Sequence, residues 1–204
     1  MWRAVLKVLN EAIVEGLSRS HTDTHDRKFL SSLRHSNEVF AAFKVHSMGE
    51  KMAEKLLDDK GKLKPFREWK EDVKGIASLY VGSWLETEYN TAVIRAHNAA
   101  NWQQFERDAD IMPNLRWMPT TSPHPESSHK KFWERQLTLP VSDPFWDKHH
   151  PGDRWNSKCS LEQTDEPATP ELKEEFRGEK PQRGLANNPR KGRKDILAGS
   201  SVFS

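Results

Sequence analysis

Side chains that could bind a metal are concentrated between residues 124 and 159, namely His124, His129, His149, His150 and Cys159. Zinc sites use histidine nitrogen and cysteine thiolate ligands in a tetrahedral array. The chain has no Cys-x-x-Cys pair and no His-Glu-x-x-His motif, and Ser157 stands where a Cys-x-Cys partner of Cys159 would be. We therefore expect no bound metal and no cofactor, with His129 and Cys159 as the weaker alternative for metal ligands.

The same residue types could perform nucleophilic catalysis, which needs Cys159 close to His129 or His149 and a group that orients the histidine. The sequence alone does not show whether these residues lie close together in the fold. Four acids could also transfer protons, although acids beside proline or glycine more often form turns and caps: Glu126, Asp143, Asp147 and Asp153. Glycine-rich phosphate-binding motifs are absent from the sequence. We expect a protein that is not an enzyme.

Composition sets broad limits on the class of protein. The 204 residues carry 32 Lys and Arg against 30 Asp and Glu, a net charge of +2, so no overall positive field indicates nucleic-acid binding. Eight Trp and nine Phe argue for a packed core although only 35% of residues are hydrophobic. One cysteine cannot form an intramolecular disulfide, and no apolar run approaches the roughly 20 residues of a membrane span. We expect a chain from a reducing cytoplasm that does not bind membranes.

Apolar residues at steps of three and four predict helices over residues 2–17, 28–57 and 66–107. A straight helix over 66–107 would be longer than about 60 Å, whereas a compact chain of this size is roughly 40 Å across. We therefore expect a break near Gly75 or at Gly82-Ser83, or else a helix that protrudes to meet a partner.

Prolines and tryptophans replace the helical period after Asp110. Short strands are predicted at 115–118, 137–139 and 158–162, and a helical turn at 127–135. The fold class is α+β, with a helical region over 1–64, a domain over 65–165 that has a small Trp-rich module of strands and long ordered loops, and a polar tail over 166–204.

The tail has few apolar residues, so we expect it to stay flexible and off the core. Deleting 183–204 should then change the free energy of unfolding by less than about 0.5 kcal/mol. Five basic residues in the tail could contact a DNA backbone, in a manner that weakens with salt: Arg183, Arg190, Lys191, Arg193 and Lys194.

One run of residues indicates a particular protein family more specifically than the patterns described so far. It consists of Asp143-Pro144-Phe145-Trp146 followed by Pro151-Gly152, then Trp155 and Cys159, with His129 upstream. The run resembles the signature of the phage Mu F-like head morphogenesis family, minor capsid proteins of tailed phages, in which a histidine precedes Asp-Pro-Phe-Trp, a Pro-Gly turn, an aromatic residue and Cys-x-Cys. Similarity to that family extends over about 65–165, and Ser157 departs from it by replacing the first cysteine.

The resemblance implies a structural role in procapsid assembly near the portal, and in some relatives an association with DNA during packaging or ejection. Its implied partners are phage portal and capsid proteins, with phage DNA contacted through the tail, and its implied location is the virion or the host cytoplasm. We interpret the signature as a folding motif in which Phe145, Trp146 and Trp155 bury large areas around the Pro151-Gly152 turn.

Two other hypotheses stay open. One is a phage-associated nuclease or toxin-type enzyme that uses His129. The other is an accessory protein that binds DNA through its basic tail.

Overall fold

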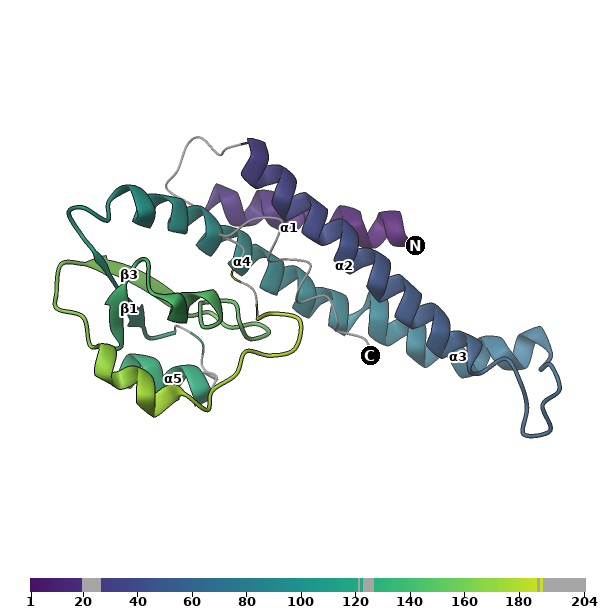
Figure 1. Ribbon diagram of the computed structural model, residues 1–204. Coiled ribbons are helices and arrows are strands. Elements are labelled where there is room, and N and C mark those ends of the chain that lie inside the picture. Colours follow the sequence, from purple (N-terminus) through teal and green to yellow (C-terminus); the bar gives the residue numbers. More distant parts are fainter. Residues whose placement is uncertain (20–26, 121, 123–126, 187, 189–204) are drawn as a thin grey trace.

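The computed structural model describes residues 1–19, 27–120, 122, 127–186 and 188. Four long helices come first: α1 (Trp2–Ser18), α2 (Arg27–Ala53), α3 (Phe66–Val81) and α4 (Ser83–Arg107). Figure 1 shows α1 lying along α4. Helix α2 begins beside these two helices and runs out along α3, and together α2 and α3 extend away from the rest of the chain. The helices predicted from the apolar period are confirmed.

The break predicted within the long third helix lies at Gly82, which ends α3 and begins α4 with φ −103° and ψ −113°. α1 and α2 pack against α4 through two apolar clusters. One joins Ile13 to Ala96 and Ala99, and the other surrounds Val5 and Leu9. The helices on the N-terminal side of residue 64, α1 and α2, therefore share a core with α4, which lies on its C-terminal side.

A small sheet covers the end of α4 (Figure 1). Its strands are β1 (Asn114–Met118), β2 (Thr138–Pro140) and β3 (Ser160–Thr164), in the antiparallel order β2-β1-β3. Helix α5 (Ser127–Glu134) and the 3-10 helix η1 (Pro144–Asp147) complete the module. The α+β class is confirmed, and the third strand begins two residues later than predicted.

Aromatic side chains form the core of this module. Trp102 from α4, Trp117 from β1 and Trp146 from η1 are at most 2% exposed. The ring of Trp146 lies 6.1 Å from that of Trp102 and 6.0 Å from that of Trp117, and its Nε1 donates a 2.8 Å hydrogen bond to the Pro140 carbonyl. The interpretation of Trp146 as a core residue is confirmed.

The expectation that the chain leaves the core after residue 165 is wrong for residues 166–186 and 188. A 3-10 helix, η2 (Pro170–Phe176), places Leu172 and Phe176 in the Trp-rich core. Just before it, Thr169 exchanges backbone and side-chain hydrogen bonds with Thr138 of β2. A few well-placed apolar residues and a bonded backbone are enough to hold a segment whose average composition is polar.

Candidate functional site

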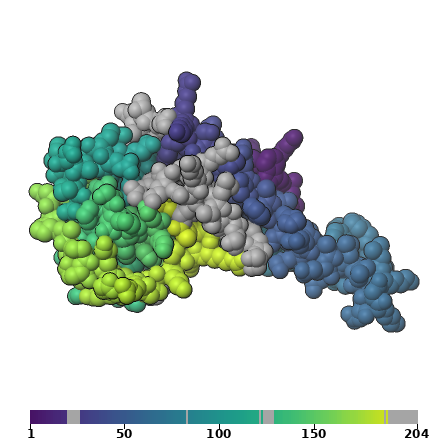
Figure 2. All heavy atoms as spheres, in the orientation of Figure 1, coloured from purple at the N-terminus to yellow at the C-terminus, as the bar shows by residue number. Residues whose placement is uncertain are grey.

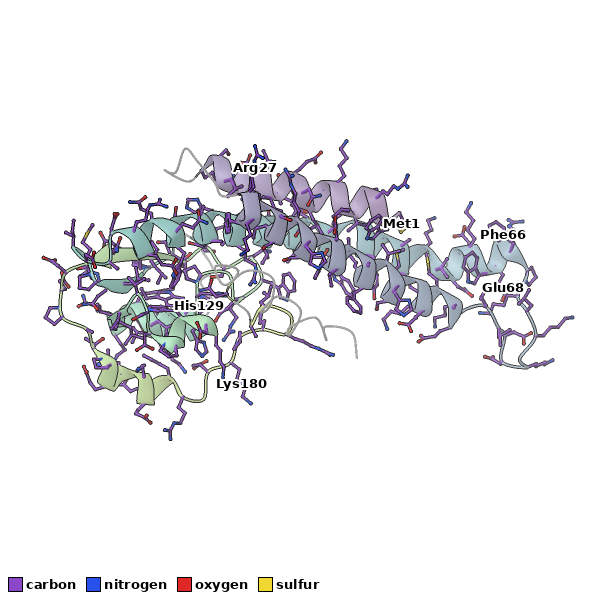
Figure 3. The ribbon with its side chains drawn as sticks, turned by 45° about the horizontal axis from the view of Figure 1, so that its top comes forward. Met1, Arg27, Phe66, Glu68, His129 and Lys180 are labelled. Carbon is purple, nitrogen blue, oxygen red and sulfur yellow. The ribbon has the colours of Figure 1, made fainter. Side chains whose placement is uncertain are left out.

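His129 lies at the centre of a buried polar cluster between α5 and the loop that follows η1 (Figure 3). Its Nε2 is 2.6 Å from Oδ1 of Asp153, and its Nδ1 is 3.0 Å from Oγ of Ser157. Sγ of Cys159 is 3.4 Å from the same Nδ1. His129 and Asp153 have no exposed surface, and Ser157 and Cys159 are 6% and 5% exposed.

This geometry makes His129 and Asp153 an ion pair. Burial alone would lower the pKa of His129, but the hydrogen bond with Asp153 and the interaction with Cys159 outweigh it and raise the pKa to about 9. Burial opposes ionisation of Asp153 too, but the hydrogen bond from His129 and the His149 ring, whose Nδ1 lies 3.5 Å from Oδ2, override it, so the pKa of Asp153 lies well below its usual range. The imidazolium donates to the carboxylate on one side and to the Ser157 hydroxyl on the other.

A second set of charged and titratable groups surrounds the pair. Arg95 of α4 donates from Nη1 to the carbonyl oxygens of Gly152 (2.9 Å) and Leu185 (3.3 Å). Burial lowers the pKa of Arg95 to about 10, although Asp153 acts against this effect. Burial, reinforced by the charge of Arg95, lowers the pKa of His150 to about 3, so His150 is neutral beside its charged neighbours.

The Pro151-Gly152 turn has a backbone that only glycine fits well. Gly152 has φ +96°, and a Cβ built on it would lie 2.7 Å from Cγ of Arg95. The turn therefore lets the loop lie directly against α4. Gln182 fastens the same loop from the other side, because its N–H donates to the Asp153 carbonyl at 2.9 Å and its Oε1 accepts from the Trp155 N–H at 2.7 Å.

The remaining signature residues support the cluster. Asp143 caps η1, with Oδ1 accepting from the Phe145 N–H at 2.8 Å, and Pro144 occupies the first turn. Phe145 is half-buried, 4.7 Å from the ring of His149. Trp155 is half-buried and lies 6.5 Å from the ring of Phe40 on α2. These residues shape and anchor the loop that carries Asp153.

The structure thus brings His129, Ser157 and Cys159 together, and it places Ser157, the departure from the family signature, directly on the histidine. His124, Glu126, Arg190, Lys191, Arg193 and Lys194 lie outside the described residues, while Arg183 is described and exposed. Within the described part of the chain, no group of three or more His, Cys, Asp or Glu residues is arranged to hold a metal ion.

Two participants were missed by sequence reasoning. The sequence pattern places Asp153 among four acids that could transfer protons or form turns, without connecting it to His129, and gives no role to Arg95. Arg95 carried a signal, because it lies among Ala92, Ala96 and Ala99 on a helix whose small residues indicate close packing. A charged residue within such a face requires a buried polar partner. No comparable signal connected Asp153 with His129, 24 residues earlier.

The residue types at the cluster, a serine, a histidine and a carboxylate in contact, are those of nucleophilic catalysis. The hydroxyl of Ser157 and the thiol of Cys159 belong to residues that are at most 6% exposed in this conformation. Searches against protein-family models, curated proteins and solved structures give no match to this chain. Among the described helices, none has the length and apolar character needed to cross a bilayer.

Proposed function

We propose that this chain is a non-enzymatic minor capsid or head morphogenesis protein of a phage or prophage, acting in procapsid assembly near the portal. One observation carries the proposal: three residues of the Mu F-like signature, His129, Trp146 and Cys159, are buried in or against the Trp-rich core. Trp146 is fully buried, Gly152 packs on Arg95, and Cys159 contacts His129. Residues that are buried and stabilise the fold support a structural role. Reactive side chains exposed on the surface would instead support an enzyme.

The shape of the molecule supports the same role. Figure 2 shows a rounded body from which the end of the helical half, around residues 50–70, projects. Such a projection offers contact surface to neighbouring subunits while the Trp-rich module provides a rigid body. In this proposal, portal and capsid proteins are the partners, the tail contacts phage DNA, and the protein resides in the host cytoplasm and then in the virion.

Fractionation of assembling particles tests the proposal. Procapsids and mature particles made by the genome that encodes this chain would be separated on a density gradient and probed for the chain and for portal protein. We expect the chain to sediment with portal protein. Its presence only in the soluble fractions, with portal protein in particles, would overturn the proposal.

The contact of His129 with Asp153 and Ser157 favours one alternative, a phage-associated nuclease or toxin-type enzyme. For catalysis, the loop that carries Asp153 would have to open and expose the cluster. The purified chain would be incubated with single- and double-stranded DNA and with RNA, beside the variant Ser157→Ala, which removes only a hydroxyl. Cleavage by the wild type that the variant lacks would favour the enzyme, and no cleavage by either favours the structural role.

A further inference from the structure

The hairpin that joins α2 to α3 exposes large apolar side chains at the end of the helical half. Leu57 is 52% exposed, Leu63 69% and Phe66 73%. Figure 3 shows Phe66 at the opposite end of the molecule from His129. These side chains thus lie far from the Trp-rich core, on the part of the molecule that projects furthest.

The exposure occurs on an ordered hairpin. Leu57 and Leu63 face each other in an antiparallel bridge, and Oδ1 of Asp58 accepts hydrogen bonds from the N–H groups of Lys60 (2.9 Å) and Lys62 (2.8 Å). Trp69 anchors the base by donating from Nε1 to the Met52 carbonyl at 3.0 Å. Side chains held outward by a rigid loop lose little entropy when they bind.

Positive charge predominates next to these side chains, with Asp58 and Asp59 before it in the turn and Glu68 after it. Residues 60–67 contain Lys60, Lys62, Lys64 and Arg67 and no acid, and they include both Leu63 and Phe66. Lys64 also forms an ion pair with Asp72 of α3 at 2.7 Å, which orients the end of this hairpin. A complementary surface would place an apolar pocket inside a rim of carboxylates.

We propose that residues 56–67 form a docking hairpin that inserts Leu63 and Phe66 into an apolar, acid-rimmed pocket of a partner protein. This inference rests on the proposed function in one respect, that the partner is a portal or capsid subunit. The run 60–67, with four cations and no acid beside Leu63 and Phe66, favours an acidic protein partner over a second copy of the chain, which would bring these cations together.

Site-specific photo-crosslinking tests the occupant. A photoreactive amino acid would replace Leu63 in the full chain, with Ile111, which is 78% exposed beyond α4, as the matched control position. The chain would be expressed during particle assembly, and crosslinked peptides identified by mass spectrometry. We expect Leu63, and not Ile111, to crosslink to an apolar segment flanked by Asp and Glu. Crosslinks to this chain itself, to lipid, to a basic segment, or none at all would overturn the inference.

Binding measurements on purified full-length chain and portal protein provide a second test. Leu63→Ser with Phe66→Ser should weaken binding at least about tenfold, as expected for anchor residues, and Ile111→Ser should leave it unchanged. Lys60→Glu with Lys62→Glu should weaken binding and its dependence on salt, whereas Lys7→Glu on α1 should not. Equal affinity for all variants would overturn the docking hairpin, even with the chain present in particles.

The two proposals fail in different ways. If the chain is absent from particles, the structural function fails, and the sequence of the crosslinked partner still decides whether the hairpin binds an acidic pocket. If the chain enters particles and Leu63 crosslinks to no acidic segment, only the hairpin proposal fails.

Discussion

His129 and Asp153 carry opposite charges although neither has any surface exposed to solvent, while His150, three residues before Asp153 in the chain, stays neutral. The difference in charge between the two histidines follows from the charged groups beside each ring. His129 has a carboxylate at 2.6 Å, whereas the positive charge of Arg95 adds to the effect of burial at His150. A buried charge is tolerated only where an opposite charge and hydrogen bonds replace the water it has lost.

These two histidines predict a stability maximum near pH 6.5. The folded pKa of His129 is raised from 6.5 to about 9, so its contribution is complete below pH 6.5 and is lost as the pH rises through 9. The folded pKa of His150 is lowered from 6.5 to about 3, so stability also falls as the pH drops below 6.5. At about 1.4 kcal/mol per pH unit, we expect losses of about 3 kcal/mol by pH 9 and about 2 kcal/mol by pH 5.

Urea unfolding of the wild type between pH 5 and 9.5 measures this profile. His129→Gln should remove the alkaline slope, and His150→Gln the acidic one, each leaving the other slope in place. A wild-type stability that is constant over this range would contradict the assignment of both protonation states.

Trp146→Ala should lower the free energy of unfolding by about 3–5 kcal/mol, because a fully buried ring leaves a cavity that its neighbours cannot fill. Ile111→Ala, at a position 78% exposed, is the control and should change it by less than about 0.5 kcal/mol. Denaturant unfolding measures both. A Trp146 variant that unfolds like wild type yet no longer binds its partner would identify Trp146 as an interface residue instead.

Helices α1 and α4 pack closely because Gly16 has no side chain. A Cβ on Gly16 would collide with the Val93 carbonyl oxygen and would lie 2.8 Å from Cβ of Ala96. Small residues on both helices thus determine how near the backbones approach, and that approach brings Ile13 into contact with the α4 side of the core.

Gly16→Ala should therefore destabilise the protein, although alanine favours an isolated helix by about 1 kcal/mol over glycine. We expect a net loss of about 1–3 kcal/mol from overpacking. Gly49→Ala on α2 is the matched control, because nothing lies within 4 Å of its added Cβ, and it should stabilise by about 0.5–1 kcal/mol. Thermal unfolding of both variants checks the contrast, and a stabilising Gly16→Ala would show that the helices can separate without cost.

Residues 182–186 and 188 act as a strap across the loop that carries Asp153. Leu185 is 4% exposed, and we expect Leu185→Ala to cost about 2–3 kcal/mol. Arg183→Ala, at an exposed neighbour, should cost less than about 0.5 kcal/mol. Deletion of 183–204 should then be markedly destabilising, contrary to the expectation from composition. Equal unfolding midpoints for the two substitutions would show that the strap contributes nothing.

At the level of the entire chain, charges nearly balance, so any DNA affinity has to come from local clusters. The cluster at Arg190, Lys191, Arg193 and Lys194 remains a prediction. Changing these four residues to glutamine should reduce the slope of log affinity against log salt for duplex DNA by about 3–4. Changing Lys7, Lys74, Lys130 and Arg177 is the matched control and should have a smaller effect. Equal slopes for both sets would exclude the tail as the DNA contact.

Local patterns in the sequence were sufficient for the helices, the three strands and the Trp-rich core, and they reduced the break in the third helix to Gly75 or Gly82-Ser83. Each of these depends on the period of apolar residues or on turn formers within a few positions, which a single stretch of sequence contains. Trp146 is an example, since an aromatic side chain of that size buries a large apolar area when it lies in a core.

Only the tertiary structure decided which polar groups meet. His129 is 24 residues from Asp153, 28 from Ser157 and 30 from Cys159, and no local period relates such positions. Arg95 reaches Leu185 across 90 residues, and that contact, with Leu172 and Phe176, holds a segment that composition assigned to a free tail. Burial of a few side chains depends on surfaces that other elements supply, and those surfaces exist only after the helices and the sheet have packed.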